Sequence, residues 1–233
     1  SPLPPTLLFT LRGPVKNKVG GQGGPPRRNA EEVRTEGLTG DGARLAFLPF
    51  LGLDGYIVRG WSHIVAGYPK TGKTELLARL CLEWQGERVL YITEEPEGVW
   101  RARLAGLPPG WGHVTLLFAL GAKPRDLLAA VEGEATVVII DTVRNLLRLR
   151  DETDNSEVAR VLTPLVAACR ARGQTLLLAH HLRKGGGIHG EGITGGHAFL
   201  GVVDIALELG FSDSHKTKRR RVGGHGRIIG SEE

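Results

Sequence analysis

An eight-residue segment of the chain has the residue types and the order that a phosphate-binding loop requires. It reads Gly67-Tyr68-Pro69-Lys70-Thr71-Gly72-Lys73-Thr74. An apolar run precedes it at residues 63–66 and an amphipathic segment follows it from Glu75, which predicts a strand, a loop and a helix. Glycines let successive backbone N–H groups turn toward a phosphate chain, Lys73 can reach the β- and γ-phosphates, and Thr74 can hold Mg²⁺. We therefore expect an ATP site with Mg²⁺, rather than a chance match in a glycine-rich chain.

Two other strand patterns end in acidic residues. Residues 137–140 are all apolar and are followed by Asp141, which is how a Walker B element places a carboxylate beside Mg²⁺. A helix-capping aspartate is the alternative interpretation. Residues 89–93 are followed by Glu94 and Glu95, and ATP hydrolysis needs a carboxylate that orients the attacking water. We assign this role to Glu94, because Glu95 is equally explained as a solvated acid near the positive end of the next helix.

A further strand pattern at residues 174–179 ends in His180 and His181 and leads into a glycine-rich loop. A polar side chain at such a strand end can touch the γ-phosphate and report its loss to the loop behind it. His181 is the better placed of the two for this sensor role. Zinc binding by the histidine pair is the competing interpretation, but no other ligand follows at metal-site spacing.

Composition and charge limit the classes of protein that the chain can be. With 233 residues, of which 41% are hydrophobic, it can bury one sizeable core. Cys81 and Cys169 fall on the apolar sides of helix patterns, which favours buried thiols over a disulfide. The longest apolar runs are strand-sized, so we expect a cytoplasmic protein without a membrane partner.

The basic residues are unevenly distributed along the chain. Five basic and no acidic residues lie in 1–28, and six basic and no acidic residues lie in 216–227. These segments are either solvated tails or contacts for a polyanion.

Strand-like and helix-like segments alternate through most of the chain, which predicts an α/β fold with a mainly parallel sheet flanked by helices. Strands are expected at 63–66, 88–93, 114–118, 136–140 and 174–179, and helices at 74–85, 98–105, 124–132 and 155–172. Short strands expected at 204–209, 219–222 and 227–229 predict an antiparallel C-terminal extension. Residues 1–43 are expected to be a basic, flexible arm or linker, 44–230 the ATPase domain and 231–233 a tail. The ends of the chain suggest a piece of a longer protein.

These motifs together resemble the RecA-like hexameric helicase ATPases, most closely the RepA-like group, with DnaB-type helicases and KaiC-like ATPases as cousins. The resemblance covers roughly residues 45–229 and implies a RecA-like P-loop core. In RecA-like folds the water-orienting carboxylate ends the strand that follows the P-loop helix, which here ends at Glu94. The resemblance also implies ATP sites between the subunits of a homo-oligomer, expected to be a hexamer. It further implies single-stranded DNA gripped by the loop after residue 182, to which we assign Arg183, Lys184, Gly185, Gly186 and Gly187.

Two departures from the RepA-like pattern bear on mechanism. RepA-like proteins often have an arginine a little after this loop that completes the neighbouring active site, whereas this chain has Thr194-Gly195-Gly196-His197 there. The segment that starts at Arg219 resembles the Lys-x-Arg-x-Gly strand of DnaB-type helicases, so we transfer the trans-acting role to Arg219 and Arg221. A solvated basic stripe is the alternative. No primase-like domain is visible in the sequence, although a primase or other replication protein is an expected partner.

Three functions remain open at this point. The first is an ATP-driven, ring-forming motor on single-stranded DNA, of the replicative helicase type. The second is a KaiC-like ATPase that switches a protein partner, and the third is a RecA/RadA-like recombinase. We favour the first, because a glycine-rich loop and a basic strand suit a phosphate-tracking channel. Leu7, Leu8 and Phe9 offer hydrophobic side chains but no clear polymerisation motif, which weakens the third.

Overall fold

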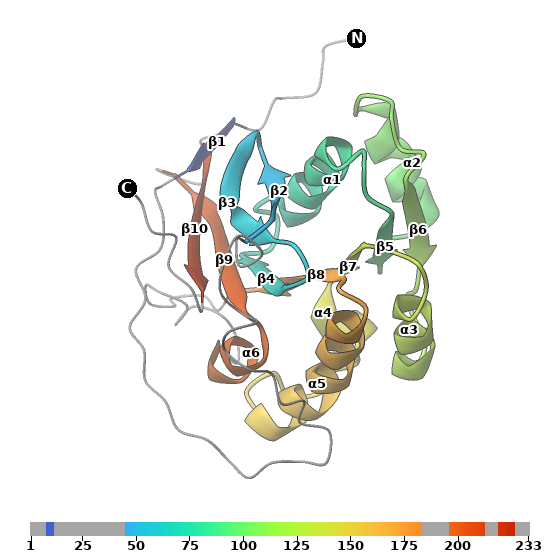
Figure 1. Ribbon diagram of the computed structural model, residues 1–233, viewed down its shortest axis with the longest axis vertical. Helices are drawn as coiled ribbons and strands as arrows, with labels where there is room; N and C mark the ends of the chain where they lie inside the picture. Colours follow the sequence, from blue (N-terminus) through green and yellow to red (C-terminus); the bar gives the residue numbers. More distant parts are fainter. Residues whose placement is uncertain (1–7, 12–44, 183–195, 213–218, 227–233) are drawn as a thin grey trace, which may run out of the picture.

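The computed structural model describes residues 8–11, 45–182, 196–212 and 219–226 (Figure 1). The expected DNA-binding residues Arg183, Lys184 and Gly185–Gly187 lie outside the described residues. So do the strand expected at 227–229, the tail, and most of the expected arm.

An eight-stranded sheet forms the centre of the protein (Figure 1). Its strands are β1 (Leu8–Leu11), β4 (Ser62–Gly67), β5 (Val89–Thr93), β6 (Val114–Phe118), β7 (Val137–Asp141), β8 (Thr175–His181), β9 (Ile205–Phe211) and β10 (Arg219–Gly226). Their order across the sheet is β1-β10-β9-β4-β8-β7-β5-β6. The strands from β9 to β6 are parallel, whereas β10 runs antiparallel to β9. The predicted parallel core and its antiparallel extension are therefore both present.

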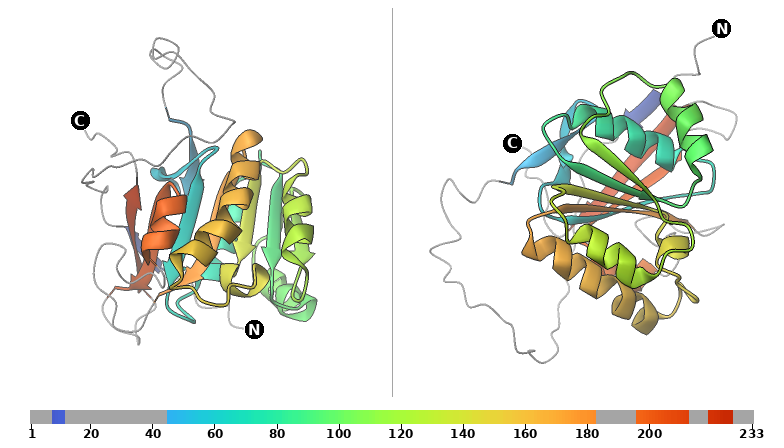
Figure 2. Two further views of the ribbon diagram at one scale, coloured as in Figure 1. Left: turned by 90° about the horizontal axis from the view of Figure 1, so that it is seen from below. Right: turned by 90° about the vertical axis from the view of Figure 1, so that its right-hand side faces the viewer.

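Helices cover both faces of the sheet, as Figure 2 shows. They are α1 (Lys73–Glu83), α2 (Glu97–Ala105), α3 (Pro124–Val131), α4 (Val143–Leu146), α5 (Asn155–Ala171) and α6 (Gly196–Val202). Helices α1 and α2 pack on one face, and α3 to α6 pack on the other. Two separate layers of buried apolar side chains result, one on each face of the strands.

The central strands are apolar on both faces because helices cover both. Every residue of β7 is buried, and its side chains alternate between the two core layers. Ile140 packs with α4 and α5, whereas Ile139 packs with α1. Both cysteines are buried and free, one in each layer. This explains the uninterrupted hydrophobic runs in the sequence.

A small second sheet of β2 (Phe47–Phe50) and β3 (Leu53–Val58) packs beside α1. The indole Nε1 of Trp84, at the end of α1, donates a hydrogen bond to the carbonyl of Pro49 at 2.8 Å. The sequence analysis predicted neither these two strands nor α4 and α6. Residues 8–11 form a strand of the main sheet, although they lie within the segment expected to be an arm. None of the helices in the described part of the chain is long and apolar enough to cross a membrane.

Parallel strands place their carboxyl ends at the same edge of a sheet, and this edge is where ligands bind in open α/β folds. Here the ends of β4, β5, β7 and β8 meet at that edge. The P-loop follows β4, the two acids follow β5, Asp141 ends β7, and the histidine pair ends β8. The order of the strands thus brings together motifs that are far apart in the sequence.

Candidate nucleotide site

The P-loop leaves the sheet at Gly67 and enters α1 at Lys73. Gly72 immediately before the helix has a φ of +98°, which favours glycine. At Gly67 the constraint is space, because a Cβ there would lie 2.8 Å from the Thr71 hydroxyl and 2.9 Å from the Leu209 carbonyl. Two of the motif's glycines are therefore required by the fold itself, apart from any contact with phosphate.

Lys73 is buried at the centre of this loop. Its Nζ donates hydrogen bonds to the carbonyls of Gly67 at 2.8 Å and Tyr68 at 3.2 Å, and lies 3.4 Å from Nδ1 of His181. Burial lowers the pKa of Lys73 to about 8, although the charge of Asp141 acts in the opposite direction. A cation held in so poorly solvated a place favours an anionic ligand.

Asp141 accepts two hydrogen bonds at one carboxylate oxygen. The Thr74 hydroxyl donates to Oδ2 at 2.6 Å and the Tyr91 hydroxyl donates to the same atom at 2.8 Å. Burial raises the pKa of Asp141, and the two hydroxyl donors oppose that shift. The Thr74 and Asp141 oxygens are hard ligands of the kind that Mg²⁺ prefers, and Mg²⁺ usually needs only one or two protein ligands beside water and phosphate. This pair therefore fits the metal.

Glu94 and Glu95 have different surroundings. The Thr142 hydroxyl donates to Glu94 at 3.2 Å, and the Glu94 N–H donates to the carbonyl of Asp141 at 3.0 Å. Glu95 instead forms a two-bond ion pair with Arg103, at 2.5 and 3.2 Å. The Arg103 guanidinium also lies over the ring of Trp100 at 4.8 Å. Glu94 is thus hydrogen-bonded to residues at the end of β7, while the carboxylate of Glu95 is paired with an arginine.

The two histidines that end β8 point to opposite faces of the sheet. His181 faces the P-loop and is half-buried, and burial together with the charge of Lys73 lowers its pKa. His180 is fully buried on the other face, where its ring lies 4.2 Å from that of Phe199 and its Nδ1 lies 3.7 Å from Glu152 Oε1. Two ligands of one metal would have to converge, and these diverge. Within the described ranges, no group of three or more His, Cys, Asp or Glu side chains could hold a metal ion.

Three arginines begin β10, and they divide between its two sides. Arg220 Nε donates to the carbonyl of Thr71 in the P-loop at 2.8 Å, and its guanidinium lies 4.1 Å from the centre of the Phe211 ring. Arg219 and Arg221 are exposed and, by strand alternation, lie on the other side. The pair assigned to a neighbouring subunit is therefore directed away from its own P-loop.

Sequence reasoning gave no role to three side chains that contact the site. Tyr91 contacts Asp141, Arg103 holds Glu95, and Arg220 holds Thr71. Tyr91 could have been found by alternation, because it lies two residues before Thr93 on a strand predicted to end at the site. Arg220 could not, because its contact depends on where β10 pairs in the sheet.

Comparisons with known proteins show which families and structures the chain resembles. A family described as an AAA domain matches residues 51–187. The DNA repair protein RadA of Mycobacterium tuberculosis is 31% identical over 166 residues, which cover 67% of this chain and 33% of that protein. The protein of the same name from Mycolicibacterium smegmatis is 27% identical over 169 residues. The chain thus spans about a third of the length of these curated relatives.

Two solved structures share the fold. A KaiC-like protein from the archaeon Pyrococcus horikoshii aligns with a TM-score of 0.62 and 20% identity, over 81% of this chain and 91% of the other. The RadB recombinase aligns with a TM-score of 0.51 and 18% identity, over 71% and 80%. At these identities the likeness concerns the fold, which is RecA-like. The P-loop motif, the family match and the fold all indicate the same conclusion: the chain belongs to the AAA domain family.

Proposed function

We propose that the protein is an ATPase that acts on single-stranded DNA in repair or recombination. The observation that carries the proposal is the match to the RadA repair proteins, together with a site whose residues suit ATP hydrolysis. This choice differs from the helicase favoured by the sequence alone, because the relatives carry the names of repair and recombinase proteins. A ring-forming helicase remains one form that such an ATPase could take.

In this proposal the chain's own residues bind and orient the substrate. The backbone N–H groups of residues 68–74 surround the phosphates, and Lys73 neutralises the β- and γ-phosphates. Thr74 and Asp141 would hold Mg²⁺, which supplies charge neutralisation at the β- and γ-oxygens when bound. Glu94 orients the attacking water, and Thr142 and the Asp141 carbonyl fix its position. His181, beside Lys73, senses the γ-phosphate at the strand end that leads toward residues 183–187.

DNA enters the proposal through the relatives and through charge. Arg183 and Lys184 would contact phosphates, and the glycines at 185–187 would let the backbone follow the strand. Assembly of several copies would place Arg219 or Arg221 of one subunit at the site of the next. A hexameric ring is the form implied by the helicase resemblance, and a filament is the form expected of a recombinase.

A KaiC-like switch acting on a protein partner is the second candidate. It is favoured by the structural match to the KaiC-like protein, which covers more of both chains than the match to the RadB recombinase. In this case ATP hydrolysis would be independent of DNA.

ATP turnover, measured with and without single-stranded DNA, distinguishes the two candidates. We expect DNA to stimulate hydrolysis by the wild-type chain, and Lys73→Ala to abolish turnover in both conditions. Turnover that DNA leaves unchanged, with no DNA bound in the presence of an ATP analogue, would favour the protein switch. Near-normal turnover by Lys73→Ala would reject the P-loop assignment itself. Particle size with and without ATP and DNA would then show whether rings or filaments form.

A further inference from the structure

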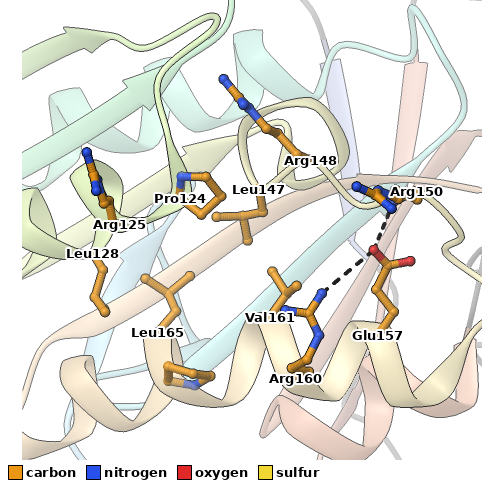
Figure 3. Close-up of a pocket in the computed structure, with 11 residues that line it drawn as sticks. Pro124, Arg125, Leu128, Leu147, Arg148, Arg150, Glu157, Arg160, Val161 and Leu165 are labelled. Atoms are coloured by element: carbon orange, nitrogen blue, oxygen red, sulfur yellow. Dashed lines mark hydrogen bonds and ion pairs between the residues drawn. The ribbon is translucent and has the colours of Figure 1, made fainter.

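A groove of about 590 Å³ lies on the face of the sheet opposite α1 (Figure 3). Helix α3 forms one wall, α5 forms the other, and the segment 147–150 after α4 forms its end. The P-loop contributes no residue to it. We call it the α3–α5 groove. Its lining residues are Pro124, Arg125, Leu128, Leu147, Arg148, Arg150, Glu157, Arg160, Val161, Pro164 and Leu165.

The floor of the α3–α5 groove is apolar. Leu147 and Leu165 are 4% and 3% exposed, and Leu128 and Val161 are partly buried beside them. Figure 3 shows these four aliphatic side chains close together between the two helices. Such a floor has room for one or two large apolar side chains of a ligand.

The rim of the groove is basic. Arg125, Arg148, Arg150 and Arg160 surround the floor, against the single carboxylate of Glu157. That carboxylate accepts backbone N–H bonds from Arg150 at 3.3 Å and Asp151 at 3.0 Å, and it lies 4.0 Å from the guanidinium of Arg160. Among the described residues no carboxylate pairs with the guanidinium of Arg148 or Arg150. The rim therefore has an excess of positive charge.

The α5 wall also has an unusual backbone. Pro164 lies inside the helix, and proline has no N–H to donate. The carbonyl of Arg160, one turn earlier, therefore cannot receive its usual helical hydrogen bond. Arg160 and Pro164 both line the groove.

We propose that the α3–α5 groove docks an acidic peptide segment of a partner protein, with a large apolar side chain as its anchor. The apolar side chain fills the floor, and the carboxylates of the peptide pair with the arginine rim. Nucleic acid fits less well, because its bases stack on aromatic side chains and the lining residues include none. This docking is separate from ATP hydrolysis and does not depend on the function proposed above.

The test is the fluorescence anisotropy of a short labelled peptide in which aspartates alternate with leucine and phenylalanine. We expect it to bind the wild-type chain, and a matched peptide with serine at the apolar positions to bind about tenfold more weakly. Arg160→Glu should weaken binding about tenfold, and binding should also weaken as salt rises. Arg101→Glu is the matched control, because Arg101 is an exposed helical arginine on α2, outside the groove. It should leave affinity unchanged.

Arg125→Ala is a second test and should also weaken binding of the peptide. The side chain of Arg125 is 77% exposed, so its loss should leave the helix packing intact. Circular dichroism would verify the fold of each variant. Equal binding of the aspartate–serine peptide would overturn the apolar anchor and leave only nonspecific charge. Loss of affinity in Arg101→Glu as large as in Arg160→Glu would place the peptide elsewhere. Displacement of the peptide by oligothymidylate, with the same dependence on Arg160, would reassign the groove to nucleic acid.

Discussion

At the scale of single residues, the two acids after β5 show how neighbouring side chains give two chemically identical carboxylates different roles. Arg103 satisfies the carboxylate of Glu95 with two hydrogen bonds, so that carboxylate is poorly suited to hold a water molecule. Among the described residues, Glu94 has the Thr142 hydroxyl as its one side-chain partner, at 3.2 Å, and it lies next to the end of β7. The geometry thus favours the acid that the sequence analysis chose for another reason.

We expect Glu94→Gln to bind ATP and to lose hydrolysis by a factor of about 10² or more, the usual scale for loss of a general base. Glu95→Gln should change turnover little and should destabilise the fold by no more than about 1 kcal/mol through loss of the Arg103 pair. Steady-state turnover and nucleotide affinity of the two variants provide the measurement. The reverse pattern would show that the base is Glu95.

At the scale of elements, His63 connects three strands. Its Nε2 accepts a hydrogen bond from the Val58 N–H of β3 at 3.0 Å, and its Nδ1 lies 3.3 Å from the Leu176 carbonyl of β8. The neutral ring, with its proton on Nδ1, satisfies both contacts. Burial lowers the pKa of His63 to about 4, although Asp204 and the backbone carbonyls oppose that shift.

This arrangement predicts acid sensitivity with a definite sign. The unfolded chain, whose histidine has a pKa near 6.5, binds the proton more readily than the native state, so stability is full above pH 6.5 and falls as pH drops toward 4. Between pH 7 and pH 5 the loss from His63 alone should be about 2 kcal/mol. Urea unfolding of the wild type and His63→Gln at both values isolates this contribution. An equal loss in both proteins would exclude His63 as its source.

A second prediction at this scale concerns strand β10, because its arginines lie on opposite sides of the strand. Arg220→Ala should weaken ATP binding, since the Thr71 carbonyl loses its hydrogen bond and the P-loop is held less firmly. Arg221→Ala should retain ATP binding and lose hydrolysis by about 10³ to 10⁵, the range for arginines supplied by a neighbouring subunit.

Mixing two inactive variants tests the geometry of that second effect. An Arg221→Ala subunit retains a sound Walker site and can use the arginine of a Glu94→Gln neighbour, so the mixture should recover activity. Activity no greater than the two residual activities combined, with subunit exchange verified separately, would show that Arg221 does not act in trans. Arg183 would be the next candidate.

At the scale of the whole molecule, the uneven charge distribution predicts how DNA binding responds to salt. If the basic segments contact phosphates, the logarithm of affinity should fall with the logarithm of salt concentration, with a slope of about −0.7 per phosphate. Lys184→Ala should lower both affinity and slope, and different homopolymers should bind similarly. Filter binding at several salt concentrations measures both quantities. A complex insensitive to salt would contradict a phosphate-tracking surface.

Much of this architecture could be predicted from the sequence, because in the central strands the apolar sequence pattern matches the burial of both faces of the strand. Residues 137–140 are apolar without a break since helices cover both of their faces, and such a run is visible in the sequence. Strand β3 is exposed over its first three residues, and α4 has only four residues, so neither has a clear period. The contacts of Tyr91 and Arg220 depend on which strands become neighbours. Propensity and spacing carry no information on that choice.

Strand β1 pairs Leu8 with Arg219, so the beginning of the chain lies beside a segment made near its end. The ribosome synthesises residues 8–11 long before residues 219–226. Strand β1 must therefore remain without its partner β10 while the rest of the chain is synthesised. Four residues provide few hydrogen bonds, and a contact between such distant segments forms late. We therefore expect amide hydrogens of the β1–β10 pair to exchange with deuterium sooner than those of β7. Protection of β1 equal to that of β7 would mean that this edge opens only when the whole protein unfolds.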